Sequence, residues 1–227
     1  MIERVASFEE IDVWLIGLDA TFDHSILSAH EIARTEGCLD PVYAQRLLAS
    51  RVGLRTVLSG YVGAAPARLT FSRTRSGAPV LVDDPECCFS LSRSRDLAVV
   101  AVGFECRVGV DIQGPAPSAA SCDALARHVL DEEERLAFDA LGADERRVVF
   151  LAAWTRREAA LKAMDFGLLD DRAPAPDETG KSALASSGWR LLRPVLAPQR
   201  VVALVSKPRT PRESADERTT GVRLART

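Results

Sequence analysis

The chain has 227 residues, of which 47% are hydrophobic and 27% are charged, and its formal net charge is -3 at pH 7. These proportions are typical of soluble globular domains and exclude a largely disordered chain or a membrane protein. The net charge also excludes a general attraction to nucleic acid or anionic lipid, so an anionic ligand needs a local cluster of Arg and Lys. We expect neither nucleic acid nor a membrane as a partner.

The cysteines and the N-terminus predict where the protein is located. The five cysteines are odd in number and lack C-x-x-C spacing, which favours reduced thiols over a disulfide framework or a zinc site. The opening segment MIERVASFEEIDVW carries charges where a secretory signal has its apolar stretch. No apolar run reaches membrane-spanning length. We therefore expect a cytoplasmic protein.

The N-terminal part predicts a buried strand followed by two helices. Residues 11–19 (IDVWLIGLD) are apolar and β-branched, as is typical of a buried strand. Ser28 and Glu31 have the spacing of a capping box, which predicts the start of a short helix. An apolar stripe predicts a longer helix over residues 41–61.

This longer helix carries Arg46, Arg51 and Arg55 near one another on its remaining surface. Such a helix is able to present several guanidinium groups to one shared ligand. Beyond it, residues 68–75 form a basic run that resembles a strand, and Gly77-Ala78-Pro79 is a turn signal.

Three further segments, 87–91, 97–104 and 107–112, have the composition of strands and predict a meander. A Pro/Ala/Ser-rich linker over residues 114–121 then separates this part from a helical one. Asp131 and Glu134 repeat the capping-box spacing at a second helix start.

A long helix is expected over residues 144–164, with a core-facing stripe of Val148, Leu151, Trp154, Ala159 and Leu161. Residues 170–188 are rich in Pro, Asp and Ser and predict an excursion loop. Strands are expected over 189–194 and 201–206, followed by a mobile tail from about residue 207.

Helices and strands in both halves predict an α+β fold of two lobes, 1–107 and 108–227. The segment 107–114 lies at their junction. We expect the second lobe to carry the chemical motifs.

Two short segments carry candidate chemistry. In GVDIQ, Asp111 ends an apolar strand, where a lone carboxylate is costly unless a cation or hydrogen-bond donors satisfy it. In WTRREAALKAMDFGL, the i, i+4, i+8 spacing places Trp154, Glu158 and Lys162 along one helix face. Converging carboxylates suit Mg²⁺, a hard cation that prefers oxygen ligands. An exposed Glu158–Lys162 pair with Asp111 capping a turn is the alternative, and spacing alone favours it.

Together, the two segments resemble the paired signature of the Sfp-type 4′-phosphopantetheinyl transferases. That signature is G-[VI]-D-[IV]-E followed by F-x-x-x-W-x-x-K-E-x-x-x-K-x-x-G-x-G-L, and the second motif here contains Phe150, Trp154, Gly167 and Leu168. The opening strand, the helix around residues 46–61, the Gly-Ala-Pro turn and FSLSRSRDLAVVAV resemble that family's N-terminal lobe in the same order. The resemblance covers roughly residues 10–170.

The resemblance implies a pseudo-twofold pair of similar α+β lobes, expected as a monomer, with the active site in the cleft between them. It implies transfer of 4′-phosphopantetheine from coenzyme A to a serine of an acyl or peptidyl carrier protein, with release of 3′,5′-ADP. Asp111, Gln113 and Glu158 would stand at the Mg²⁺ site. Glu158, Lys162 and Asp111 would be catalytic, with Glu158 also the candidate general base.

The residues expected to bind coenzyme A are basic or hydroxylated. The resemblance implies Arg46, Ser92, Arg93 and Lys162 for this role, and nearby Arg side chains extend the set. The full set is Arg46, Arg51, Arg73, Arg75, Ser92, Arg93, Arg157 and Lys162.

The chain departs from the family pattern at several of these positions. Gln113 replaces an acid, Arg93 replaces a histidine, Arg157 replaces a lysine, and Ala78 stands where a basic residue is frequent. Asp165-Phe166 replaces a small or polar pair. These departures motivate a second hypothesis, a weakly active or inactive homologue that acts as a coenzyme A or carrier-protein binding module.

Overall fold

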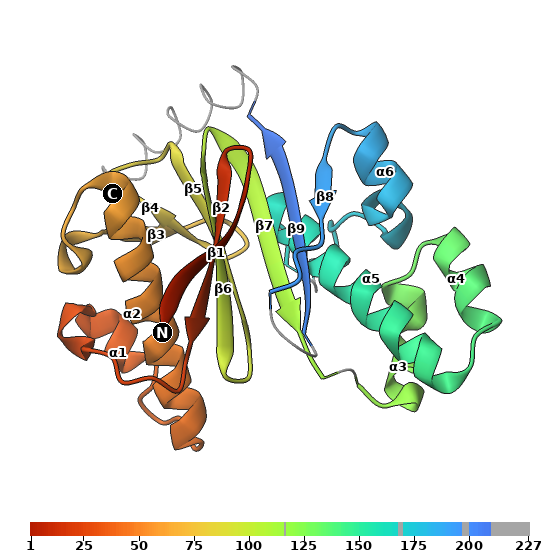
Figure 1. Ribbon diagram of the computed structural model, residues 1–227, viewed down its shortest axis with the longest axis horizontal. Coiled ribbons are helices and arrows are strands. Elements are labelled where there is room, and N and C mark those ends of the chain that lie inside the picture. The colour runs from red at the N-terminus through yellow and green to blue at the C-terminus, as the bar shows by residue number, and fades with distance from the viewer. Residues whose placement is uncertain (116, 168–169, 197–199, 210–227) are drawn as a thin grey trace.

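The computed structural model describes residues 1–115, 117–167, 170–196 and 200–209, which form a mixed α/β structure. Two β-sheets lie side by side in the centre, with the long helix α2 outside one and the long helix α5 outside the other (Figure 1). The helices and strands are β1 (Ile2–Phe8), β2 (Ile11–Gly17), α1 (Ala29–Ala33), α2 (Pro41–Val62), β3 (Phe71–Arg73), β4 (Pro79–Leu81), β5 (Cys87–Ser94), β6 (Leu97–Phe104), β7 (Cys106–Gln113), α3 (Ala119–Leu125), α4 (Glu132–Asp139), α5 (Ala143–Ala163), α6 (Lys181–Ser186), β8 (Arg190–Leu192) and β9 (Val201–Pro208).

The first sheet has the strand order β1-β2-β6-β5, and all its neighbours are antiparallel. The second sheet has the order β7-β9-β8 and is also antiparallel. Strands β3 and β4 form a separate two-stranded ribbon. Apolar side chains from both larger sheets, among them Val13, Val99 and Val110, are buried in one cluster. The two sheets are therefore held together by hydrophobic packing.

Helix α2 begins and ends at well-capped positions. The side chain of Asp40 accepts hydrogen bonds from the first-turn amides, Pro41 occupies the first turn, and Gly63 ends the helix with a φ of 67°. Leu54 and Leu58 of α2 pack against Ile16 in the first sheet. This packing fixes the face of α2 that remains available for ligands.

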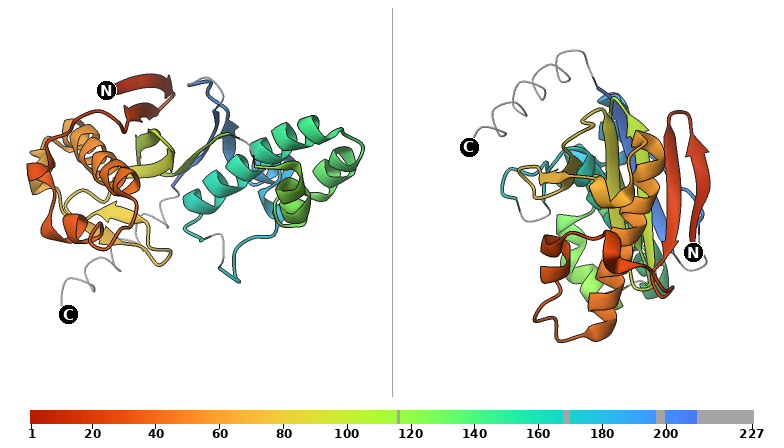
Figure 2. Two further views of the ribbon diagram at one scale, coloured as in Figure 1. Left: turned by 90° about the horizontal axis from the view of Figure 1, so that it is seen from below. Right: turned by 90° about the vertical axis from the view of Figure 1, so that its left-hand side faces the viewer.

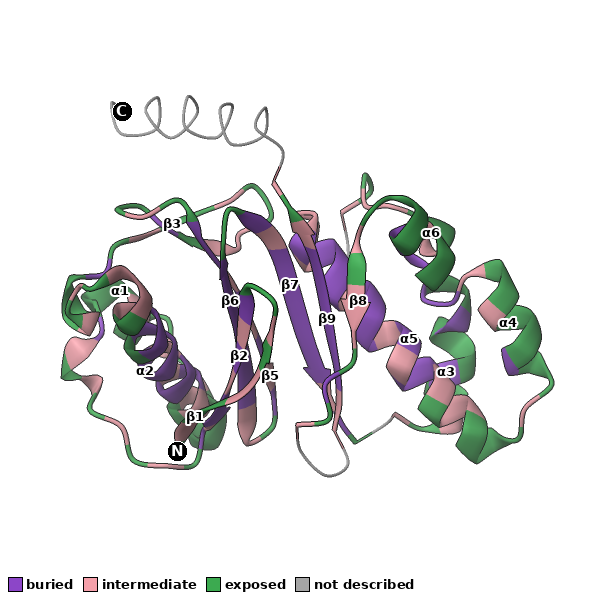
Figure 3. Cartoon of the chain, turned by 45° about the horizontal axis from the view of Figure 1, so that its top comes forward, coloured by how far each residue is buried: buried purple, intermediate pink, exposed green. Residues whose placement is uncertain are grey.

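Helix α5 packs very closely against the second sheet. Small residues of α5, Ala159, Ala160 and Ala163, are buried against Ala203 of β9. Gly109 of β7 lies so close that an added Cβ atom would stand 2.0 Å from the carbonyl oxygen of Ala159. Figure 3 shows that α5 is buried over much of its length, while α1, α4 and α6 are largely exposed. The close approach brings the two motif segments together.

Several local predictions are confirmed. The capping boxes of Ser28 with Glu31 and of Asp131 with Glu134 are both present. Helices α2 and α5 agree with the predicted ranges 41–61 and 144–164 to within one or two residues. These elements were predictable because their signals are local.

Other predictions are wrong. The meander does not continue into β7, which leaves the β5–β6 hairpin and pairs with β9. Val148 is 65% exposed, so the core-facing stripe of α5 does not include it. The expected excursion loop contains α6 and a 3-10 turn at Pro176–Thr179.

The two chain ends also differ from the prediction. Residues 2–8 form β1, an edge strand that was not expected, with a register shift between Arg4 and Ala6. Lys207 and Pro208, assigned to a mobile tail, are the last residues of β9. The rest of the predicted tail, 210–227, and Leu168 lie outside the described residues.

Among the described residues, no helix has the length and apolar character needed to cross a membrane. The division into lobes 1–107 and 108–227 and their pseudo-twofold relation remain predictions.

Arg55 is buried instead of lying on the surface with Arg46 and Arg51. It is 4% exposed and its guanidinium forms an ion pair with Glu31 at 2.7 Å. It also donates to the carbonyl oxygens of Pro66 and Leu69. Arg55 therefore ties α1 and the segment before β3 to α2, a structural role.

Replacement of Glu31 by Gln is expected to lower the free energy of unfolding by about 1–3 kcal/mol at neutral pH. Burial raises the pKa of Glu31, but hydrogen bonds from Arg55 and Ser28 outweigh it and hold the pKa below 4.5. The interactions that lower the pKa of Glu31 stabilise the fold fully above pH 4.5. This stabilisation is lost as the pH falls through the pKa that Glu31 has in the folded protein. Gln keeps the capping box. Urea denaturation measures the free energy of unfolding of both proteins. The difference between the wild type and Glu31→Gln should therefore be smaller at pH 3 than at pH 7.

Candidate active site

A cleft of about 540 Å³ lies where four elements meet: α2, β5, β7 and α5. We call it the main cleft. Most of the predicted site residues line it, although they come from distant parts of the chain. The residues of this set are Arg46 from α2, Ser92 and Arg93 from β5, Asp111 and Gln113 from β7, and Glu158 and Lys162 from α5.

Asp111 is only 1% exposed, and hydrogen-bond donors surround its carboxylate. Its Oδ1 accepts from Ser92 Oγ at 2.6 Å and from Lys162 Nζ at 2.7 Å, and its Oδ2 accepts from Gln113 Nε2 at 3.0 Å. Lys162 also donates to the carbonyl oxygen of Val110 at 3.2 Å. The partner of Lys162 is thus Asp111 from another element, not Glu158 one turn away on its own helix.

Glu158 lies in the same cleft in a poorly solvated position. Burial raises the pKa of its carboxyl above 4.5, the attraction of Lys162 opposes this rise, and the negative charge of Asp111 adds to it. Glu158 and Asp111 are therefore close enough to repel each other. A carboxyl in this environment is suited to holding a cation or accepting a proton.

The donor set of the main cleft fits a magnesium ion. Asp111 and Glu158 supply carboxylate oxygens, and Gln113 has a neutral amide oxygen in addition to the Nε2 that it donates to Asp111. Within the described residues, no group of three His, Cys, Asp or Glu side chains gathers into a metal site. Because Gln113 stands where the family signature has an acid, a magnesium ion in this cleft would need water and substrate oxygens to complete its coordination.

Arginine side chains lie on the α2 and β5 side of the main cleft. Arg46 forms a bidentate pair with Asp19, with Nε to Oδ1 at 2.7 Å and Nη2 to Oδ2 at 2.9 Å. The guanidinium of Arg93 stands 5.8 Å from the ring centroid of Tyr43. Arg46 and Arg93 are thus held in fixed positions by Asp19 and Tyr43, and Asp40 at the start of α2 lines the same cleft.

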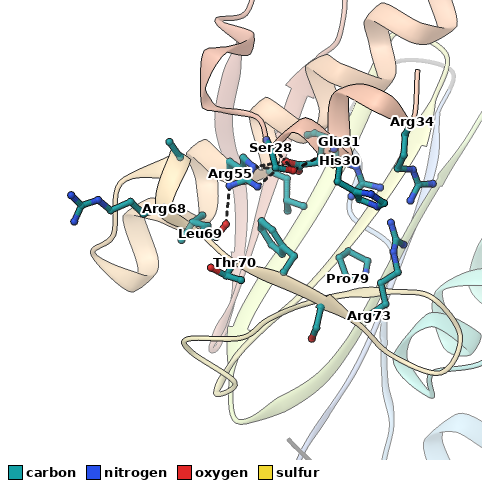
Figure 4. A pocket seen from close by; sticks show the side chains of 15 residues that line it. Ser28, His30, Glu31, Arg34, Arg55, Arg68, Leu69, Thr70, Arg73 and Pro79 are labelled. Carbon is teal, nitrogen blue, oxygen red and sulfur yellow. Dashed lines mark hydrogen bonds and ion pairs between the residues drawn. The ribbon is translucent and has the colours of Figure 1, made fainter. Parts of the chain in front are cut away.

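A second pocket of about 420 Å³, which we call the basic pocket, lies between α1, α2 and the β3–β4 ribbon. Arg34, Arg51 and Arg73 line it together with Pro79. Figure 4 shows the side chains of Arg34 and Arg73 approaching one another from two sides. Burial, followed by the positive charges of Arg93 and Arg34, lowers the pKa of Arg51 to about 10. An anion bound here would relieve this repulsion.

Arg51 also connects the two cavities. It lines the basic pocket, and its pKa responds to Arg93, which lines the main cleft. The main cleft and the basic pocket are therefore close enough for the charge of Arg93 in one to lower the pKa of Arg51 in the other.

Two of the predicted coenzyme A residues lie elsewhere. Arg157 donates to Thr179 Oγ1 at 2.9 Å and to the carbonyl oxygen of Pro174 at 3.0 Å, and it does not line the main cleft. The reason is helical geometry, because adjacent residues of α5 are about 100° apart and Glu158 faces the cleft. Arg75 is exposed in the β3–β4 turn and lines neither cavity.

Some residues of the two cavities were not predicted. Tyr43 and Arg95 line the main cleft, and Arg34 lines the basic pocket. Arg95 has a φ of 56° in the turn between β5 and β6. The basic stretch SRSRD was the available signal for Arg95, and no sequence pattern distinguished Tyr43 or Arg34 from ordinary surface residues.

Comparisons with known proteins agree with this site. A family model described as the 4′-phosphopantetheinyl transferase superfamily matches residues 107–197, the segment that contains both motifs. The 4′-phosphopantetheinyl transferase HetI of Nostoc sp. is 30% identical over 196 residues, covering 81% of this chain and 82% of the relative. A putative 4′-phosphopantetheinyl transferase of Synechocystis sp. is 30% identical over 200 residues, covering 82% of this chain and 81% of the relative.

A shorter match gives the same result. The L-aminoadipate-semialdehyde dehydrogenase-phosphopantetheinyl transferase of Eremothecium gossypii is 37% identical over 131 residues, which is 55% of this chain and 47% of that protein. The extent of the two cyanobacterial matches shows the family. The chain belongs to the 4′-phosphopantetheinyl transferase superfamily. The resemblance noted in the sequence is thereby confirmed.

Proposed function

We propose that this enzyme transfers the 4′-phosphopantetheine group of coenzyme A to a serine of an acyl or peptidyl carrier protein. The observation that carries the proposal is the main cleft, where Asp111, Glu158 and Lys162 line one cavity together with arginine side chains. A phosphoryl transfer depends on positioning and on neutralising charge, and this arrangement supplies groups for both. The family relationship defines the reaction, and the residues that line the main cleft are the ones to which we assign it.

The two acids share one role in this proposal, and Glu158 has a second. Asp111 and Glu158 would hold Mg²⁺, with Gln113 contributing its amide oxygen directly or through water. The metal, when bound, neutralises charge on the diphosphate of coenzyme A. Asp111 is oriented by Ser92 and Gln113, which keep its carboxylate in one position. Lys162, already within 2.7 Å of Asp111, places a positive charge beside the diphosphate.

Glu158 would act as the general base. Because burial raises its pKa, the carboxylate is a stronger base than an exposed glutamate. It accepts the proton of the carrier serine hydroxyl while the serine oxygen bonds to the β-phosphorus of coenzyme A. The bond from that phosphorus to the oxygen bridging the two phosphates breaks, and 3′,5′-ADP leaves.

Coenzyme A would extend from the main cleft to the basic pocket. Its diphosphate belongs near Asp111, Glu158 and Lys162, where the metal and the ammonium balance its charge. Its nucleotide phosphate belongs near Arg51, where the repulsion among arginines favours an anion. Arg46 and Arg93 would guide the segment in between, and Arg73 would face the nucleotide from the basic pocket.

Intact-mass spectrometry tests the proposal. Incubation with coenzyme A, Mg²⁺ and an apo carrier protein is expected to add one phosphopantetheine group to the carrier, and chelation of the metal should prevent the gain. Absence of any mass gain on acyl and peptidyl carriers, with folded enzyme and saturating Mg²⁺, would contradict the proposal. Calorimetric binding of coenzyme A without transfer would instead favour the binding-module hypothesis that Gln113 and Arg93 motivate.

The cytoplasm, a monomeric state and the absence of nucleic-acid and membrane partners belong to the same proposal. The absence of nucleic-acid and membrane partners and the cytoplasmic location rest on the composition and net charge of the chain. The monomer rests on the pseudo-twofold architecture that the family resemblance implies. The polyketide or nonribosomal-peptide context is likewise proposed through the carrier protein. Size-exclusion chromatography with light scattering tests the monomer.

A further inference from the structure

A direct contact connects the turn of the β3–β4 ribbon to the end of α5. Thr74 Oγ1 and Ser76 Oγ both lie 2.5 Å from Asp165 Oδ1 and donate to it. The two hydroxyls are also 3.1 Å from each other. The left view of Figure 2 shows the β3–β4 turn extending toward this end of α5. One carboxylate oxygen thus joins two segments that are remote in sequence.

The backbone of Asp165 is in an unusual conformation for this residue type. Its φ is 60°, in the left-handed region that glycine adopts most easily. Two hydrogen bonds, from Asp165 N to Lys162 O and from Phe166 N to Leu161 O, end α5 in a Schellman motif. Glycine is the usual residue at this place in the motif. Asp165 therefore holds an unfavourable backbone conformation at a place where helix termination alone would favour glycine.

The other end of the contact is a tightly organised turn. Thr74 Oγ1 accepts a hydrogen bond from Ala78 N, and Arg73 donates to the carbonyl oxygen of Gly77 at 2.7 Å. Arg73 and Pro79, on either side of this turn, line the basic pocket. Movement of the turn would therefore displace one wall of that pocket.

Asp165 also lies close to the main cleft along the chain. It follows Lys162 by less than one helical turn, and Lys162 and Glu158 line that cleft. The contact of Asp165 with Thr74 and Ser76 thus fixes the wall of the basic pocket relative to the helix that carries the acid and the lysine. A ligand that reaches both cavities requires that spacing to be constant.

We propose that Asp165 is a positioning residue that locks the β3–β4 turn to α5 and so sets the distance between the two cavities for coenzyme A. This inference rests on the proposed function, because coenzyme A is the ligand that occupies both cavities. It assigns to Asp165 no contact with the substrate. Asp165 holds the turn that contains Gly77, and this turn holds Arg73 in the wall of the basic pocket.

Replacement of Asp165 by Gly separates this role from simple electrostatics and from folding. Glycine suits the left-handed backbone, so the melting temperature is expected to stay the same or rise. Loss of a negative charge would by itself strengthen binding of anionic coenzyme A. Loss of the two hydrogen bonds from Thr74 and Ser76 to the Asp165 carboxylate is expected to weaken coenzyme A binding about tenfold, because their positioning effect on the turn is lost. Calorimetry with coenzyme A in the absence of Mg²⁺ measures the dissociation constant.

Kinetics and hydrogen exchange provide two further readouts. For Asp165→Gly the KM for coenzyme A is expected to rise about tenfold while kcat at saturating coenzyme A changes much less. Amide exchange of Gly77 and Ala78 is expected to accelerate in the free protein. The variant Thr74→Val/Ser76→Ala removes the donors from the other side and should reproduce the weaker binding with Asp165 intact.

Asp171→Gly is the matched control, because it removes an equal charge at an exposed position and should leave affinity unchanged. Unchanged coenzyme A affinity or unchanged turn exchange in Asp165→Gly would overturn the positioning role. Failure of the wild-type chain to bind coenzyme A would overturn the proposed function itself. The wild-type binding measurement therefore distinguishes the two failures.

Discussion

Replacement of Glu158 by Gln is expected to reduce the rate of phosphopantetheine transfer by more than about 100-fold without unfolding the chain. The amide has nearly the shape of the carboxylate, but it lacks the charge that would hold Mg²⁺ and the basic oxygen that would accept the serine proton. Because burial raises the pKa of Glu158, the neutral amide is less costly to bury. The melting temperature without Mg²⁺ should therefore equal or exceed that of the wild type. Intact-mass kinetics and scanning calorimetry measure the two effects.

Two further measurements, with added ligand and at lower pH, test the roles assigned to Glu158. Mg²⁺ with coenzyme A should raise the melting temperature of the wild type more than that of Glu158→Gln. The raised pKa of Glu158 implies that its stability difference from Gln shrinks as the pH falls toward 4.5 and below, where the carboxyl is protonated in both states. Glu3→Gln, an exposed change on β1, should alter neither property. Transfer by Glu158→Gln at the wild-type rate would contradict both assigned roles.

Replacement of Gly109 by Ala is expected to lower the free energy of unfolding by more than about 3 kcal/mol and to abolish transfer. The new Cβ atom would lie 2.0 Å from the carbonyl oxygen of Ala159 and 2.5 Å from the amide nitrogen of Ala163. Both are backbone atoms, so α5 itself has to move away from β7. That movement separates Glu158 and Lys162 from Asp111. Urea denaturation and the mass assay give the two measurements.

Gly60→Ala is the matched control for the glycine substitution. Gly60 is in α2, and an added Cβ there would meet no atom within 4 Å. Alanine has the higher helix propensity, so the control is expected to be stabilised by about 0.5–1 kcal/mol and to remain active. A denaturation midpoint of Gly109→Ala equal to that of the wild type would show that β7 and α5 tolerate a wider spacing.

The long helices were predictable from sequence because their signals lie within a few residues. The apolar stripe of residues 41–61 in α2 is a local property of the chain, and so is the cap of Ser28 with Glu31 at the start of the short helix α1. Strand pairing is not local, and its predictions were less accurate. Strand β7 has the apolar pattern of a buried strand, but nothing near it indicates that it pairs with β9 instead of continuing the β5–β6 hairpin.

The site shows the same division between local and distant information. The spacing of Glu158 and Lys162 places both on one face of α5, and both line the main cleft. By the same helical geometry Arg157, which directly precedes Glu158, lies on another face of α5 and donates to Thr179. The partnership of Lys162 with Asp111 was not predictable from an i, i+4 pattern, because it depends on the close packing of α5 on β7 that Gly109 permits.

The sequence by itself determined the family, the two motifs and the elements that carry them, because each depends on residues close together in the chain. Only the tertiary structure decided that Ser92, Gln113 and Lys162 converge on Asp111. It also decided that Arg55 is buried and that Asp165 reaches the β3–β4 turn. Side-chain partners that are distant in sequence are selected by how sheets and helices pack, and no local pattern encodes that packing.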